Sequence, residues 1–277
     1  MAIDRGCVGM TTDEHAYTYD AERVILYALG VGAKKSELDY LYEGRGPRVL
    51  PTFAVVPAYD ALHEALGRTG GTLENIVHGH QRVTVHQPLP PRGTVRSTCT
   101  VAALYDLKRM AQAVLTTRTT DADGRLLVET EWGILFLGEG GWGGEAPPAR
   151  ETSTPTRPPD ARVEETTGPE QALLYRLLGD KNPLHADPEF PLVARFKGAP
   201  ILHGLCTYGY LCRALARSLC GGDAGRIKSI TARFSKPVWP GDTLLTDLWV
   251  EGNRAWMRTA TRESGEPVLT HCTAELA

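Results

Sequence analysis

An aspartate and a histidine stand on either side of a proline, at Asp180, Pro183 and His185. A carboxylate and an imidazole can take a proton from one atom and return it to another. Residues five positions apart lie on different faces of a helix, but Pro183 disfavours helical backbone at the residue before it. We therefore expect a bend that brings Asp180 and His185 together for general acid–base chemistry.

The elements that must hold this pair recur along the chain. A helical turn at Tyr27 is repeated at Tyr175, and a strand that ends in a turn at Gly93 is repeated at Gly241. Both repeats are offset by 148 residues, which indicates a duplication followed by divergence. The first copy reads Val-Gly-Ala over residues 31–33, with neither the acid nor the imidazole, so we expect it to be catalytically silent.

Each half also contains a segment, at residues 50–66 and 201–216, that is apolar on nearly all sides. Such segments are typical of buried central helices. Each is followed by runs rich in Val, Thr, Leu and Trp that turn at residues 121–124 and 263–265 and read as antiparallel strands. A buried helix and an antiparallel sheet that wraps it predict an α+β fold of the hotdog type, present twice.

A stretch rich in Gly, Pro and Thr separates the halves and is typical of a linker. We predict a degenerate N-terminal repeat over residues 1–140, a linker over 141–165 and a catalytic C-terminal repeat over 166–277. The glycines of residues 140–144 are not followed by the Lys-Ser/Thr of a phosphate-binding loop, so they favour a flexible connection.

Composition points to small-molecule chemistry in a reducing compartment. The 277 residues are 42% hydrophobic and 23% charged, with a formal net charge of −3, which does not favour nucleic acid or an anionic membrane as a partner. The six cysteines form no Cys-x-x-Cys pair and read as buried free thiols. No apolar run reaches the roughly 18 residues of a membrane helix, and we expect a cytoplasmic protein.

Two plainer interpretations of the Asp180 segment compete with catalysis. On its own, Asp-x-Asn-Pro is most often a turn whose side chains bond their own backbone. A calcium loop that starts at Asp180 would need Gly at its sixth position and Glu at its twelfth, where this chain has His185 and Pro191. We therefore expect no metal at this segment.

Longer motifs identify a family. The run from Tyr175 to His185, with Ala-Asp-Pro after it, resembles the signature of the R-specific 2-enoyl-CoA hydratases, the hydratase 2 group of the MaoC-like dehydratases. Residues 200–209, 233–237 and 240–244 match further motifs of that group. The first half is similar to the degenerate N-terminal repeat of the eukaryotic-type enzymes, so the resemblance spans almost the whole chain. It implies a double hotdog fold and a hydro-lyase.

The resemblance implies a mechanism for reversible hydration of trans-2-enoyl-CoA to (3R)-3-hydroxyacyl-CoA. Asp180 and His185 would hold one water, with Asp180 as the base toward water and His185 as the proton partner of the alpha carbon, although the sequence does not separate these roles. We expect Asp180 in a largely apolar pocket that raises its basicity. The Gly204 backbone N–H would bind the thioester oxygen, and Asn182 would orient the water or the aspartate.

Coenzyme A would enter as part of the substrate, with no separate cofactor. Its phosphates need cations, and the available side chains are those of Arg195, Lys197, Arg233 and Lys236. The silent first repeat would accommodate the acyl chain, and two-repeat chains of this family imply a homodimer. A dehydratase or thioesterase that acts on a carrier-protein thioester, and a non-catalytic acyl-thioester binder, remain alternatives.

Overall fold

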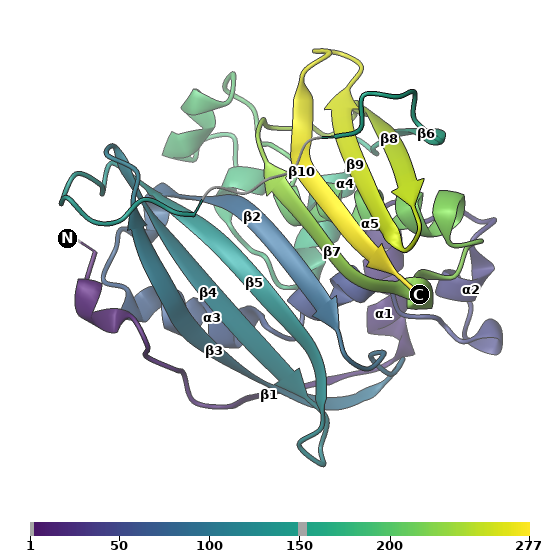
Figure 1. Cartoon of the computed structure of the whole chain (residues 1–277), viewed down its shortest axis with the longest axis horizontal. Helices are drawn as coiled ribbons and strands as arrows, with labels where there is room; N and C mark the ends of the chain where they lie inside the picture. The colour runs from purple at the N-terminus through teal and green to yellow at the C-terminus, as the bar shows by residue number, and fades with distance from the viewer. Residues whose placement is uncertain (1–2, 149–153) are drawn as a thin grey trace. The chain divides into compact units, whose positions relative to one another are not determined.

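The computed structural model of the protein describes residues 3–148 and 154–277 and contains two compact units (Figure 1). The first unit comprises residues 1–18, 54–87 and 94–151. The second comprises residues 19–53, 88–93 and 152–277. A segment of the first sequence half, residues 19–53, is therefore part of the unit that contains Asp180 and His185.

The first unit is built on five strands in the order β1-β3-β4-β5-β2. Their bounds are β1 His15–Tyr19, β2 Ile76–Val85, β3 Gly93–Asp106, β4 Met110–Thr120 and β5 Leu126–Leu137. The predicted turn at residues 121–124 joins β4 to β5, with Gly124 at a positive φ of 78°. The helix of this unit, α3 (Tyr59–Arg68), packs against β4.

Helix α3 differs from its expected form. The prediction of a fully buried helix over residues 50–66 is wrong for the first half, because residues Pro51–Val55 form a short 3-10 turn, η3, and α3 begins only at Tyr59. The side chains of Asp60 and His63 are exposed on one face of the helix, whereas those of Leu62 and Leu66 are buried on the other. Helix α3 is therefore a short amphipathic helix.

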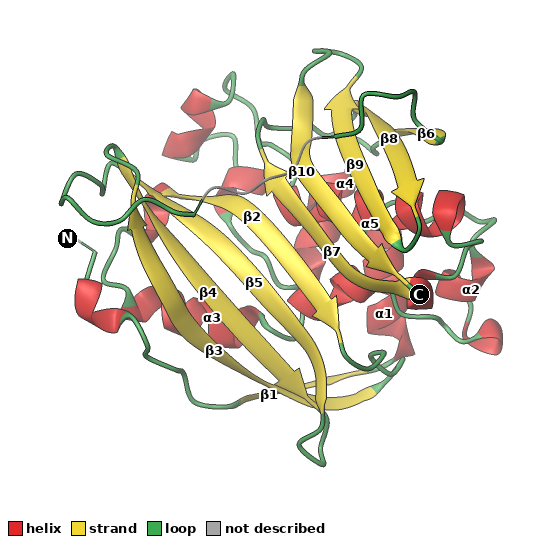
Figure 2. Cartoon of the chain, viewed as in Figure 1, coloured by secondary structure: helices red, strands yellow, loops and turns green. Residues whose placement is uncertain are grey.

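The second unit has five strands in the order β7-β10-β9-β8-β6. Their bounds are β6 Ala161–Thr166, β7 Ile227–Phe234, β8 Thr243–Glu251, β9 Arg254–Thr261 and β10 Pro267–Leu276. Helix α5 (Gly204–Leu219) packs against β6, β7 and β8, on one face of these strands (Figure 2). Residues 205–216 are buried without a break, which confirms the predicted central helix of the second half.

Strand β6 lies at the end of the region predicted as a linker and was not anticipated. It pairs antiparallel with β8, from Ala161 opposite Leu248 to Thr166 opposite Thr243. Its side chains alternate between half-buried and exposed, as expected at the edge of a sheet. Strand β6 contains three charged residues, so it has no apolar run of the kind that predicts a strand.

The glycine-rich segment at the start of that region is held by one carboxylate. Asp106 accepts hydrogen bonds from the backbone N–H groups of Gly141 and Gly143, each at 2.8 Å, and from Lys108 at 2.7 Å. These bonds lower the pKa of Asp106, the Gly141 N–H contributing most. Glycine is needed here because Gly141 and Gly143 have φ values of 89° and 77°.

Three short helices complete the second unit: α1 (Ala21–Gly30), α2 (Leu38–Leu41) and α4 (Gln171–Tyr175). Asp20 caps α1 by accepting a hydrogen bond from the Arg23 N–H at 3.0 Å. Helix α1 packs against both α2 and α4. Among the described residues no helix has the length and apolar character needed to cross a membrane. The six cysteines are free and buried, as predicted.

The chain after α1 packs tightly against α5. Gly32 has φ 83°, and a Cβ at this position would overlap the ring of Tyr210. A Cβ at Gly209 would likewise overlap the side chain of Val31. Two glycines therefore allow the end of α1 to touch the central helix. At the 148-residue offset Gly32 corresponds to Asp180, and an acidic side chain at Gly32 would overlap Tyr210 of α5.

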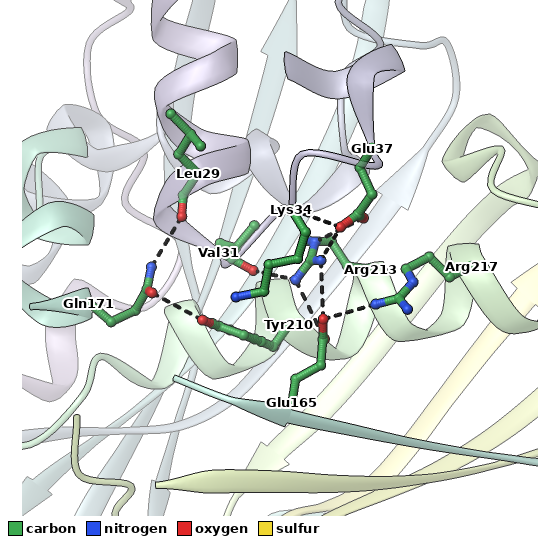
Figure 3. A network of polar contacts seen from close by, with 9 residues as sticks. All are labelled: Leu29, Val31, Lys34, Glu37, Glu165, Gln171, Tyr210, Arg213 and Arg217. Carbon is green, nitrogen blue, oxygen red and sulfur yellow. Dashed lines mark hydrogen bonds and ion pairs between the residues drawn. The ribbon is translucent and has the colours of Figure 1, made fainter. Parts of the chain in front are cut away.

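Polar contacts fix the same junction. Gln171 donates from Nε2 to the carbonyl oxygen of Gly30 at 2.6 Å. It also donates to the Leu29 carbonyl at 3.2 Å, and its Oε1 accepts from the Tyr210 hydroxyl at 3.1 Å (Figure 3). The last carbonyls of a helix have no partner within the helix. Gln171 supplies that partner, and so ties α1 to α4 and α5.

A buried arginine makes the second tie. Arg213 of α5 is 1% exposed, forms ion pairs with Glu37 and with Glu165 at 3.2 Å, and donates to the Val31 carbonyl at 2.9 Å (Figure 3). Arg217 adds a second cation at 2.9 Å from Glu165. Burial alone would lower the pKa of the Arg213 guanidinium, but the two carboxylates outweigh it and raise that pKa. The cluster joins residues 31–37, β6 and α5.

Replacing Arg213 tests this cluster. Arg213→Met would leave two carboxylates buried without their shared cation, and we expect the free energy of unfolding to fall by about 3–5 kcal/mol. The control is Arg217→Met, at a side chain that is 45% exposed, for which the expected loss is below about 1 kcal/mol. Urea denaturation of both variants measures the difference. Equal losses would contradict the importance assigned to Arg213.

Candidate active site

The segment between α4 and α5 carries the candidate pair. Helix α4 continues into the 3-10 turn η5 (Arg176–Leu178), and Gly179, with φ 131°, reverses the chain before Asp180. A second 3-10 turn, η6 (Pro183–His185), then begins at the proline. Asn182 has a ψ of 123°, which is not helical, as expected before a proline, but the helix has already ended at Leu178.

Hydrogen bonds within the bend set its shape. The Asn182 side-chain oxygen accepts from the Leu184 N–H at 3.0 Å, and the Asn182 N–H donates to Asp180 Oδ1 at 3.2 Å. The His185 N–H donates to the Asn182 carbonyl at 3.2 Å. Asn182 therefore orients the aspartate through its backbone and caps the turn that carries His185 through its side chain.

The bend brings three ionisable side chains together. One ligating atom each from Asp180, His185 and His203 lies within 4.8 Å of the others. Asp180 is half-buried, whereas His185 and His203 are 9% and 1% exposed. The predicted convergence of Asp180 and His185 thus occurs, and His203, which was not among the predicted site residues, joins them.

The tautomer of His185 follows from its partner. Its Nδ1 lies 2.8 Å from the carbonyl oxygen of Ile201, which can only accept, so Nδ1 carries the proton. Burial lowers the pKa of His185, against the opposing effects of Asp180 and of the Ile201 hydrogen bond. The ring is therefore neutral near pH 7, with an unprotonated lone pair on Nε2.

His203 lies directly against this ring. The centroids of the two imidazoles are 3.8 Å apart with an interplanar angle of 28°. Its Nε2 donates to the Asp180 backbone carbonyl at 3.3 Å, and its buried Nδ1 has no hydrogen-bond partner. Burial, with the neighbouring His185 second in effect, lowers the pKa of His203 to about 3. The second imidazole is also neutral.

Each imidazole of this group already uses one ring nitrogen. His185 Nδ1 donates to the Ile201 carbonyl and His203 Nε2 donates to the Asp180 carbonyl, which leaves His185 Nε2 and His203 Nδ1 for other contacts. The expectation that no metal binds at this segment stays a prediction.

Gly204 occupies the position expected for an oxyanion donor. It is the first residue of α5, in the turn whose N–H groups have no helical partner and where the helix dipole favours negative charge. A Cβ on Gly204 would lie 3.0 Å from the Phe234 ring. The absence of a side chain at Gly204 therefore lets the first turn of α5, next to His203, pack close to the Phe234 ring.

The four cations suggested for the coenzyme A phosphates are all exposed and come from different elements of the second unit. Arg195 ends the 3-10 turn η7 (Pro191–Arg195), and Arg233 lies in β7. Lys197 places its Nζ 4.4 Å from the centroid of the Trp239 ring, and Lys236 pairs with Glu266 at 3.5 Å. The two lysines therefore already have partners.

The low pKa of His203 predicts an acid-sensitive fold. An unfolded histidine binds its proton below about pH 6.5, whereas folded His203 remains neutral to about pH 3, so acidification through this window favours the unfolded chain. The loss approaches about 1.4 kcal/mol per pH unit. His203→Phe should therefore lose less stability between pH 6.5 and 4.5 than the wild type in urea denaturation. Equal losses would mean that His203 is not held neutral.

Comparison with known proteins places the chain in a family. The MaoC-like domain model matches residues 150–271, and the model of the hydratase 2 N-terminal domain of multifunctional enzyme type 2 matches residues 17–138. The chain is 41% identical to 3-hydroxyacyl-thioester dehydratase Y of Mycobacterium tuberculosis, over 94% of this chain and 92% of that one. It is 37% identical to peroxisomal enoyl-CoA hydratase 2 of Arabidopsis thaliana, over 92% and 90%.

Solved structures agree. A MaoC-like dehydratase from Phytophthora capsici superposes with a TM-score of 0.85 at 31% identity, over 100% of this chain and 98% of that one. A double hotdog protein of Mycobacterium tuberculosis superposes with a TM-score of 0.64 at 16% identity, over 98% and 96%, and supports the fold alone. The chain therefore has the double hotdog fold and belongs to the MaoC-like dehydratase family.

Proposed function

We propose that the protein is a carbon–oxygen lyase that adds water reversibly to trans-2-enoyl-CoA and forms (3R)-3-hydroxyacyl-CoA. The relatives named enoyl-CoA hydratase and 3-hydroxyacyl-thioester dehydratase support this reaction and its reverse. The observation that carries the proposal is that an Asp180 carboxylate oxygen lies within 4.8 Å of a ring nitrogen of His185, whose Nδ1 donates to Ile201 and whose Nε2 therefore carries no proton. These are two acceptors for the two protons of one water.

A water held in this way has its oxygen lone pairs free for carbon 3 of the substrate. His185 has no proton on Nε2 in its neutral state, so it cannot first protonate the alpha carbon. In the proposed step the water O–H bond breaks toward His185 or Asp180 as the C3–O bond forms, and the proton then passes to carbon 2. One residue acts as base and then as acid, and both atoms of the O–H bond add to the same face.

The developing enolate oxygen needs a donor. The Gly204 backbone N–H is the proposed one, because it lies at the start of a 16-residue helix and next to His203, which touches both members of the pair. The substrate is proposed to arrive as a coenzyme A thioester, with Arg195 and Arg233 as the exposed cations for its phosphates. The homodimer and the cytoplasmic location stay predictions.

The catalytic pair is tested directly by hydration of crotonyl-CoA, followed by the loss of absorbance and by the chirality of the product. Asp180→Asn and His185→Gln should each lower kcat by about 10²–10⁴-fold, because each removes a proton acceptor. The control is Asp187→Asn, an exposed acid of the same loop, which should stay within about twofold of wild type. Full activity in both pair variants would refute the mechanism.

The first repeat is proposed to accommodate long acyl chains. In this half the central helix begins only at Tyr59, and the residues before it form a 3-10 turn. The support for this role is the shorter helix, because α3 has 10 residues whereas α5 has 16. We expect kcat/KM to rise from four-carbon to longer enoyl-CoA substrates, measured over a series of chain lengths. A strict preference for four carbons would contradict this role.

A carrier-protein thioester remains the alternative substrate, since one relative is named for 3-hydroxyacyl thioesters in general. Comparing kcat/KM for the same acyl group on coenzyme A and on an acyl carrier protein separates the two. Thioesterase activity would instead release free thiol from saturated acyl-CoA, which a colorimetric thiol assay detects. Either result would reassign the substrate or the reaction without changing the pair.

A further inference from the structure

His203 contacts both members of the candidate pair. Its imidazole lies on the His185 ring at a centroid distance of 3.8 Å, and its Nε2 donates to the backbone carbonyl of Asp180 at 3.3 Å. On another side the Tyr175 ring lies 4.9 Å away at an angle of 50°. A single side chain thus bridges the two residues of the bend.

The backbone of His203 is itself held firmly. Its carbonyl accepts from the N–H groups of Cys206 and Thr207, at 3.0 and 3.2 Å, as the cap of α5. Helix α5 is buried along residues 205–216, and Arg213 anchors it to β6 and to residues 31–37. His203 therefore extends from a fixed element, whereas Asp180 and His185 lie on a loop of irregular backbone.

We infer that His203 is a positioning residue for the reaction proposed above: its ring holds the plane of His185 while its Nε2–H holds the Asp180 backbone, so that both groups face one water. This inference rests on the proposed function for its catalytic meaning. It assigns two separable tasks to one side chain, a packing task for the ring and a hydrogen-bonding task for the nitrogen.

The charge of His203 suits this role. The ionisable groups that act on it are His185, Asp180 and Arg176, and burial keeps its pKa at about 3. A proton on His185 during turnover would therefore face a neutral aromatic ring rather than a second cation. Because the His203 ring covers one face of His185, it also excludes water there and helps keep the pKa of His185 low.

Three substitutions separate the two tasks. His203→Phe keeps a ring against His185 but has no donor for the Asp180 carbonyl. His203→Gln can place an amide N–H where Nε2 stands but has no ring. His203→Ala has neither. We expect kcat to fall about tenfold for Phe and for Gln and about 100-fold for Ala, with KM within about threefold, since each lost contact is worth about one factor of ten.

The pH profile gives a readout that a purely structural role would not change. The acid limb of kcat/KM reports protonation of His185 in the free enzyme, and activity falls as that proton is bound. Gln and Ala admit water beside His185, so the limb should move to higher pH, toward that of an exposed histidine. Phe keeps the face dry and should leave the limb in place. Circular dichroism and thermal unfolding verify that each variant is folded.

Two results would overturn the inference: wild-type kcat in folded His203→Phe and His203→Gln, or an acid limb that moves equally in all three variants. Failure of the proposed function is distinguishable, because it would appear as a wild-type protein that hydrates no enoyl-CoA. In that case an NMR titration of His185 in the same variants still tests the contact, with an upward shift of its pKa expected for Gln and Ala and none for Phe.

Discussion

The buried guanidinium of Arg213 is the interaction on which the second unit depends. Two carboxylates surround it, one on β6 and one on the segment after α1, and a backbone carbonyl accepts its remaining donor. Removing any partner would leave a charge in an apolar interior, which is far more costly than losing an exposed pair. The arginine therefore holds β6 and residues 31–37 against α5. The first turn of α5 carries Gly204 and follows His203 of the candidate site.

These contacts of Arg213 help to explain why the sequence halves and the compact units do not coincide. Residues 19–53 belong by sequence to the first repeat and by packing to the second unit. Gln171 binds the end of α1 through two carbonyls, only nine residues before Asp180. The first repeat thus contributes contacts to the helix that precedes the bend. Residues 19–53, which lack the acid and the imidazole of the pair, pack in the unit that contains Asp180 and His185.

The features that the sequence predicted are those set by neighbouring residues or by the spacing of apolar residues along an element. Pro183 disfavours helix at Asn182, which has a ψ of 123°. The predicted convergence of Asp180 and His185 occurs, although the helix itself ends earlier, at Leu178. The apolar character of α5 predicted its burial. Contacts that depend on docking were not predictable. The stacking of His203 on His185 requires α5 to meet the loop, and Arg213 finds Glu37 at a separation of 176 residues. Strand β6 was missed because only two of its residues, Ala161 and Val163, are apolar, and Glu165 completes its half-buried face.

The glycine after α1 restricts which side chains the first repeat can carry. Gly32 has a backbone conformation that disfavours any side chain, and the space beyond it is filled by Tyr210, whose hydroxyl donates to Gln171. An acid introduced at this position alone would overlap the tyrosine ring. Accommodating a carboxylate there therefore requires compensating changes at Tyr210 and at its contact with Gln171, so the two positions are coupled.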